Sequence, residues 1–277
     1  MKFQNNHSRG CRDGRRPTSR KGIFWDVTAQ HWGKLLALGG VLLVCALPLL
    51  GLRIYEDICI LTLQQELSGE ELLAQMISLR NTNAILEIPA MVLLFVAVAA
   101  VLRPLRQFAW GEIVSVGEEL LAGLKQNAGH GALCGVLTAL GCASAKIGMN
   151  MAAVTQDATS LLFSLPMWLM VLLVPLMGYT LVCICIYNNR FFVNLKIAAA
   201  LLGKHPFRTL LAAALSTMPA WLAWLFPQFY VRMFGGAVGM GLLVWGLLGW
   251  LLFVCGKLDE DVNPTYFPEL VGKGIGG

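Results

Sequence analysis

The sequence predicts an all-α fold, that of a polytopic membrane protein with six transmembrane helices and both termini in the cytoplasm. Three observations predict it. Of the 277 residues, 57% are hydrophobic and only 13% are charged, which is too apolar for a soluble globular protein. Apolar runs of membrane-spanning length recur along the chain, and Lys and Arg residues gather between alternate runs.

Six runs are close to the roughly 20 residues that a helix needs to cross a bilayer. A basic arm, residues 1–33, precedes them and contains too few apolar residues to fold alone, so we expect it to be disordered in the cytoplasm. The bundle takes up residues 34–256, and residues 257–277 form a polar cytoplasmic tail. The expected spans are residues 35–54, 84–102, 129–150, 161–186, 210–226 and 235–255.

The distribution of cations sets the orientation, because Lys and Arg close to the end of a span hold that end on the cytoplasmic side. With both termini inside, 17 of the 21 Lys and Arg residues fall on the cytoplasmic side. The four on the outer side are Arg53, Arg80, Lys146 and Arg232. This asymmetry favours an inner location for both chain ends.

Two segments on the cytoplasmic side are expected to form amphipathic helices. In residues 103–127, Ser115 and Glu118 have the spacing of a capping box, and the apolar residues that follow share one helix face. Residues 187–209 contain four cations and no acidic residue. We expect the two helices to present basic side chains to a cytoplasmic partner or to lipid headgroups, namely Arg106, Lys125, Arg190, Lys196, Lys204 and Arg208.

The first outer connection, residues 55–83, has more acidic than basic residues. Ser68 followed by Glu71 predicts a capping box, and therefore a short amphipathic helix over residues 69–79 that lies on the outer surface. An alternative is that this helix forms a lid over a ligand.

Two opposite charges occur inside neighbouring expected spans. Glu87 lies about one turn inside the outer end of the second span, and Lys146 lies near the outer end of the third. An unpaired charge is costly in hydrocarbon, so we expect these antiparallel helices to bring the two side chains together as an ion pair. The pair could serve as a proton or substrate site, it could be structural, or the two charges could reach the outer headgroups separately.

The sequence contains no recognisable catalytic motif. Its four histidines are scattered, and Cys183 and Cys185 are placed on different faces of a helix without a nearby histidine to complete a metal site. There is no phosphate-binding glycine loop. We therefore expect a non-enzymatic protein without a metal or cofactor. Nucleic-acid binding is disfavoured because the basic residues punctuate apolar runs instead of forming one polar domain.

Several short motifs resemble the YesL-like integral membrane proteins of Gram-positive bacteria. They are FWDVTAQHWGKLLALGGVLLVCALP at 24–48, RQFAWGE at 106–112, GLKQN at 123–127 and YNNRFFVNLKIAAALLGKHPFRTLL at 187–211. The chain departs from the family pattern at Gly39 and Gly40, where an Asn is common, and in its longer basic arm. The resemblance implies a polytopic protein of the bacterial plasma membrane without enzymatic activity, often associated with oligosaccharide import.

A second likeness concerns the run IAAALLGKHPFRT at 197–209, which looks like the loop by which ABC-importer permeases dock on their ATPase. The acidic residue of that loop is replaced here by Ile197. Our leading expectation is an accessory or scaffold protein of solute uptake. The alternative is a permease subunit for a neutral or sugar-like solute, with Trp and Tyr side chains lining the route and a separate ATPase as partner.

Overall fold

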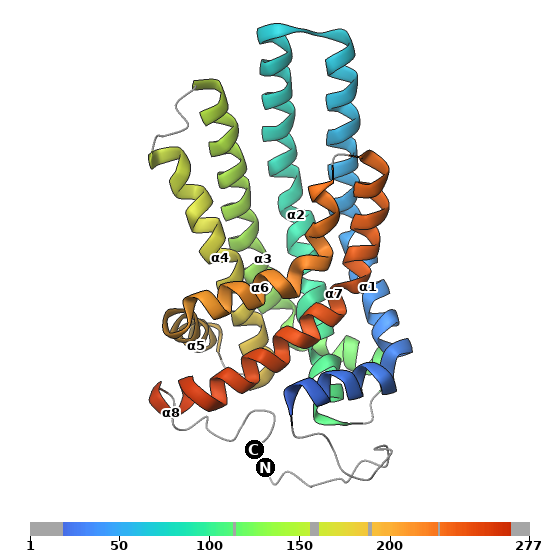
Figure 1. Cartoon of the computed structure of the whole chain (residues 1–277), viewed down its shortest axis with the longest axis vertical. Coiled ribbons are helices and arrows are strands. Elements are labelled where there is room, and N and C mark those ends of the chain that lie inside the picture. The colour runs from blue at the N-terminus through green and yellow to red at the C-terminus, as the bar shows by residue number, and fades with distance from the viewer. Residues whose placement is uncertain (1–18, 113–114, 156–160, 188–189, 227, 267–277) are drawn as a thin grey trace.

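A computed structural model describes residues 19–112, 115–155, 161–187, 190–226 and 228–266 (Figure 1). Within these ranges every element is helical, which confirms the all-α prediction. Two long helices open the chain. They are α1 (Arg20–Glu66) and α2 (Gly69–Trp110), and they form an antiparallel hairpin whose turn is at Leu67 and Ser68. We call the end of the bundle that carries this turn the hairpin end.

The hairpin corrects the expectation for residues 55–83. They do not lie flat on a surface, because α1 and α2 continue as straight extensions of the expected spans up to the turn (Figure 1). Ser68 is the N-cap of α2, but its side chain makes no capping hydrogen bond, and Gly69 next to it has a positive φ of 65°. Residues 55–66 contain neither Gly nor Pro, so nothing in that stretch ends α1 earlier.

The start of α1 also differs from the sequence prediction. Ser19 accepts a hydrogen bond from the backbone N–H of Gly22 at 3.1 Å, so α1 begins at Arg20 and the last part of the expected disordered arm is helical. Residues 1–18 of that arm lie outside the described residues. The non-helical backbone angles within α1 fall at His31, whereas Pro48 lies inside the helix.

Two further helices stand beside the hairpin. Helix α3 (Val116–Thr155) joins the expected cytoplasmic helix of residues 115–127 to the expected third span without a break. Helix α4 (Leu161–Tyr187) agrees closely with the expected fourth span. Glycines bring α3 close to α2: a methyl group on Gly131 or Gly135 would meet the backbone of Val96 or Val92.

After α4 the chain bends sharply between consecutive helices. The axes of α4 and α5 (Phe191–Lys204) differ by 119°, and α5 lies at one side of the bundle, in the half away from the hairpin turn (Figure 1). Helix α6 (Pro206–Trp221) begins with a Pro and continues into a 3₁₀ segment, Leu222–Leu225. Helix α7 (Phe229–Lys257) is followed by a π-helical turn, Leu258–Val262, and by the short α8 (Asn263–Tyr266).

The core forms where α1, α2, α4 and α7 meet. Leu38 and Leu42 of α1 are fully buried, as are Val244 and Leu248 of α7. A glycine of α7 also allows a close approach to α6: a methyl group on Gly239 would overlap the backbone carbonyl of Pro219.

In the part of the chain that the structure describes, four helices, α1, α2, α3 and α7, are long and apolar enough to cross a membrane, and counting the bent α4–α5 pair as one span gives five. Large apolar side chains are also exposed along their outer faces. On α6, for example, Phe207, Leu211 and Leu215 are exposed and recur every four residues. An apolar surface of this kind suits hydrocarbon rather than water, in agreement with a membrane protein.

Candidate functional site

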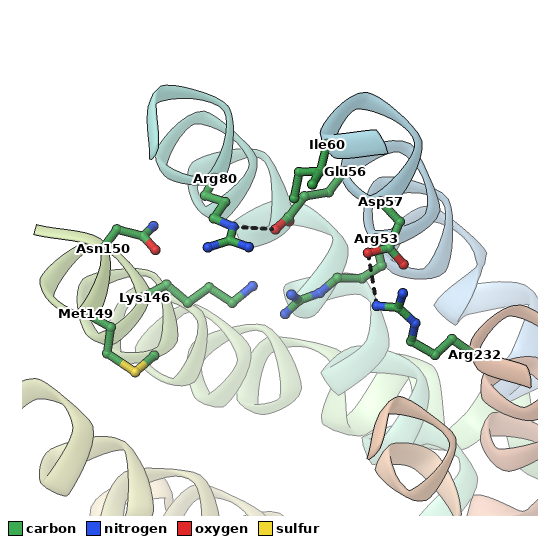
Figure 2. A pocket seen from close by; sticks show the side chains of 9 residues that line it. All are labelled: Arg53, Glu56, Asp57, Ile60, Arg80, Lys146, Met149, Asn150 and Arg232. Carbon is green, nitrogen blue, oxygen red and sulfur yellow. Dashed lines mark hydrogen bonds and ion pairs between the residues drawn. The ribbon is translucent and has the colours of Figure 1, made fainter. Parts of the chain in front are cut away.

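A partly enclosed cavity of about 340 Å³ lies at the hairpin end, between helices that are far apart in the sequence (Figure 2). Helix α1 contributes one face of its surface, with residues at the i, i+3, i+4 and i+7 positions of a helical stripe. Helices α2, α3 and α7 close the other sides. The lining residues are Arg53, Glu56, Asp57 and Ile60 of α1, Arg80 of α2, Lys146, Met149 and Asn150 of α3, and Arg232 of α7.

Beside the cavity, one buried carboxylate holds two cations. Glu87 of α2 is 5% exposed and accepts hydrogen bonds from Arg53 of α1 and Lys146 of α3. The Arg53 Nε to Glu87 Oε1 distance is 2.8 Å, and Lys146 Nζ contacts Glu87 Oε2. The predicted pair of Glu87 and Lys146 is therefore present in the structure. Arg53 is a third member, so that the carboxylate ties three helices together.

A second group of polar contacts lies nearer the hairpin turn. The side-chain amide of Asn83 donates to Glu56 Oε2 at 2.5 Å, and Arg80 Nε lies 3.8 Å from Glu56 Oε1. Arg232 Nη1 of α7 lies 3.1 Å from Asp57 Oδ1 of α1. These contacts fix the side chains of α1 against α2 on one side and against α7 on the other.

The charges of this cluster do not balance. Four cations, Arg53, Arg80, Lys146 and Arg232, face three carboxylates, Glu56, Asp57 and Glu87. Counted over the residues that the structure describes, the cluster therefore has one positive charge in excess when all of its members are ionised. These four cations are also the four Lys and Arg residues that the expected six-span topology places on the outer side.

Sequence reasoning found Glu87 and Lys146 but not the other charged residues of the cavity. One signal was available: Arg53, Glu56, Asp57 and Ile60 have the spacing of a single helix face. That spacing was hidden because residues 55–83 were expected to form a loop with a separate surface helix.

Toward the opposite end of the bundle, α1 packs on α2 and α7, and α3 packs on α2. One to two turns further along each helix, the residues are small or apolar and buried. They are Ala46 and Leu50 of α1, Ala90 and Leu94 of α2, Ala139 and Ala143 of α3, and Gly236 and Met240 of α7. The charged cavity is thus a pocket with an apolar floor.

The predicted basic residues lie toward the end opposite the hairpin turn, and five of the six are exposed: Lys125, Arg190, Lys196, Lys204 and Arg208. Helix α5 is half-buried, as predicted. It packs Phe191, Ile197 and Leu201 inward and leaves Lys196 and Lys204 outside. Lys204 Nζ also lies 5.7 Å from the ring centroid of Tyr266.

Arg106 does not fit the prediction for this group. Its side chain donates to the backbone carbonyl of Cys185 at 2.5 Å, and its guanidinium lies 4.4 Å from the ring centroid of Trp110. Because these contacts use the guanidinium to join α2 to α4, we assign Arg106 an internal structural role.

Among the described residues, no group of three or more His, Cys, Asp or Glu side chains is arranged to hold a metal ion. Cys183 and Cys185 are both buried as free thiols within α4.

Comparison of the chain with models of known protein families, with curated proteins and with solved structures finds no match.

Proposed function

We propose that this chain is a non-enzymatic accessory or scaffold protein of solute uptake in the bacterial plasma membrane. The observation that carries the proposal is the group of five exposed basic residues at the end opposite the hairpin: Lys125, Arg190, Lys196, Lys204 and Arg208. Four of them lie close together in the sequence: Arg190 is the N-cap of α5, Lys196 and Lys204 lie on α5, and Arg208 lies in the first turn of α6. Their exposed side chains are available to a cytoplasmic partner or to anionic headgroups.

The proposed topology has six spans and both termini in the cytoplasm. Helix α4, with 27 residues, is long enough to cross the bilayer, and α6 followed by its 3₁₀ segment supplies the remaining crossing. Helix α5 then lies along the cytoplasmic interface between them. In this orientation the basic residues follow the positive-inside rule, and the charged cavity opens on the outer side.

The shape of the bundle supports a scaffold more than a permease. The charged cavity has an apolar floor of packed residues, among them Leu50 and Leu94. Among the described residues its lining includes neither Trp nor Tyr, which are the side chains expected along a route for a neutral or sugar-like solute. A permease subunit for such a solute is therefore the weaker candidate. We also propose that the chain is a YesL-like protein, which agrees with the accessory role.

Replacing Arg190, Lys196, Lys204 and Arg208 together by Gln tests the proposed docking role. We expect recovery of an ABC-type ATPase or permease subunit with the tagged protein from membranes to fall about tenfold, because each exposed cation adds roughly 1 kcal/mol at most to such a contact. The measurement is quantitative mass spectrometry of the co-purified proteins.

The control variant replaces Glu66, Glu70 and Glu71 by Gln. These residues are exposed around the turn at the hairpin end, so the control changes charge far from α5. Equal recovery from wild type and the α5 variant would remove the docking role, provided that both accumulate in the membrane.

A further inference from the structure

We propose that the charged cavity at the hairpin end binds a ligand through one singly charged oxyanion group, a carboxylate or a phosphodiester. The inference concerns the opposite end of the molecule from the basic residues of α5. Its failure would leave the proposed docking role untouched, and the reverse also holds.

The excess charge is the first argument. Three carboxylates neutralise three cations, so a cluster that served only to join the helices would be complete without the fourth. A half-buried cation is favourable when an anion is near it. One bound monoanion would make the cluster neutral.

The position of the cations is the second argument. The side chains of Arg53, Arg80 and Lys146 come from three helices, and Figure 2 shows their charged ends turned toward the same space. The Arg80 side chain is 43% exposed, and its Nε lies 3.8 Å from Glu56, beyond hydrogen-bonding distance. The planar guanidinium of Arg80 is therefore well placed to form two hydrogen bonds to a carboxylate or phosphate.

The distribution of charge over the molecule is the third argument. Under the proposed topology just four Lys and Arg residues of the 21 lie on the outer side, and all four line this one cavity. The positive-inside tendency disfavours cations there, so topology alone does not account for their presence. Pairing with the three carboxylates accounts for three of the cations, and binding of an anion accounts for the fourth.

The size of the cavity limits the ligand. A volume of about 340 Å³ is at the lower end of the range for small-molecule sites. It suits a small organic acid or a single lipid headgroup. Both present the same chemistry, an oxyanion with one negative charge beside hydroxyl or ester oxygens.

The experiment uses the full chain purified in neutral detergent. Gluconate and sorbitol are titrated separately while binding is followed by isothermal calorimetry, because the two have the same carbon chain and differ in the carboxylate. In parallel, the protein is placed in nanodiscs of equal phosphatidylglycerol and phosphatidylcholine, re-extracted, and its retained lipid is quantified by mass spectrometry.

Two substitutions change the cavity in opposite directions. Arg80→Gln removes the excess charge, and we expect it to weaken anion binding about tenfold. Asp57→Asn removes the carboxylate that lies 3.1 Å from Arg232 and raises the excess among the described residues to two charges, so it should tighten binding by a similar factor. Lys21→Gln removes an exposed cation at the far end of α1 and should leave binding unchanged.

Binding of gluconate without binding of sorbitol identifies a free solute as the source of the oxyanion. Enrichment of phosphatidylglycerol without gluconate binding identifies a headgroup. Either result supports the proposal when the Arg80 and Asp57 variants shift it in the stated directions. Equal affinity for gluconate and sorbitol would overturn the proposal. So would a failure of both the wild type and Asp57→Asn to bind gluconate or to retain phosphatidylglycerol.

Discussion

At the scale of the residue, Glu87 determines how the hairpin end is held together. Its carboxylate is buried and contacts both Arg53 and Lys146, which are themselves only partly exposed. When one partner of a buried ion pair is removed, the remaining charge is buried without a counter-charge. The resulting loss of stability is larger than the net contribution of the intact pair. The contribution of Glu87 to stability is therefore best seen by deleting its charge.

We expect Glu87→Gln to lower the free energy of unfolding by about 3 kcal/mol, the low end for a broken buried pair, since Arg53 is 35% exposed. The measurement is thermal or chemical denaturation in detergent. Glu66→Gln, at the exposed hairpin turn, is the control and should change stability by less than about 0.5 kcal/mol. Adding Lys146→Met to Glu87→Gln should restore part of the loss. A loss equal to that of the control would contradict the assigned role.

The pairing of Glu87 with Lys146 could be predicted because depth in the membrane can be counted along two neighbouring helices. The part played by Arg53 could not. It depends on how α1 is rotated about its own axis and on how closely it approaches α2, and neither follows from the order of residues. Arg106 shows the same limit, because its internal acceptor is the carbonyl of Cys185, 79 positions along the chain.

At the scale of the element, the sequence predicts where helices occur more accurately than it predicts the residues at which they begin and end. Among the described residues, four of the six expected spans lie in helices that are long and apolar enough to cross a membrane, and α4 agrees with its expected bounds. The hairpin was missed because a capping signal at Ser68 suggested a separate short helix. In the structure the absence of a helix breaker in residues 55–66 determines where α1 ends, so α1 runs on to Glu66.

Contact between α1 and α7 depends on the absence of a side chain at Gly39. A methyl group there would overlap the backbone carbonyl of Gly241, whereas a methyl group on Gly40 would meet nothing within 4 Å. We expect Gly39→Ala to destabilise the protein by about 1–3 kcal/mol through overpacking. Gly40→Ala should be neutral or stabilise α1 by up to about 1 kcal/mol. Thermal unfolding of the two variants in detergent tests the contact, and similar midpoints would show that α1 and α7 do not approach so closely.

At the scale of the whole molecule, charge is separated between the two ends of the bundle. The exposed basic residues Arg190, Lys196 and Arg208 lie at the end opposite the hairpin, whereas three of the four cations at the hairpin end are offset by Glu56, Asp57 and Glu87. A cluster with only one charge in excess exerts little force on orientation. The unmatched cations therefore dominate the choice of side, which is why we place them in the cytoplasm.

This orientation makes a definite prediction for tag accessibility. A short epitope inserted at the α1–α2 turn, between Ser68 and Gly69, should be recognised by antibody on intact cells, because the turn is exposed beyond the expected spans. An epitope fused after Gly277 should be recognised only after the membrane is permeabilised. With six spans, a third epitope next to Gln228, between the 3₁₀ segment and α7, should behave like the first. A C-terminal epitope detected on intact cells would reverse the orientation and place the charged cavity on the cytoplasmic side.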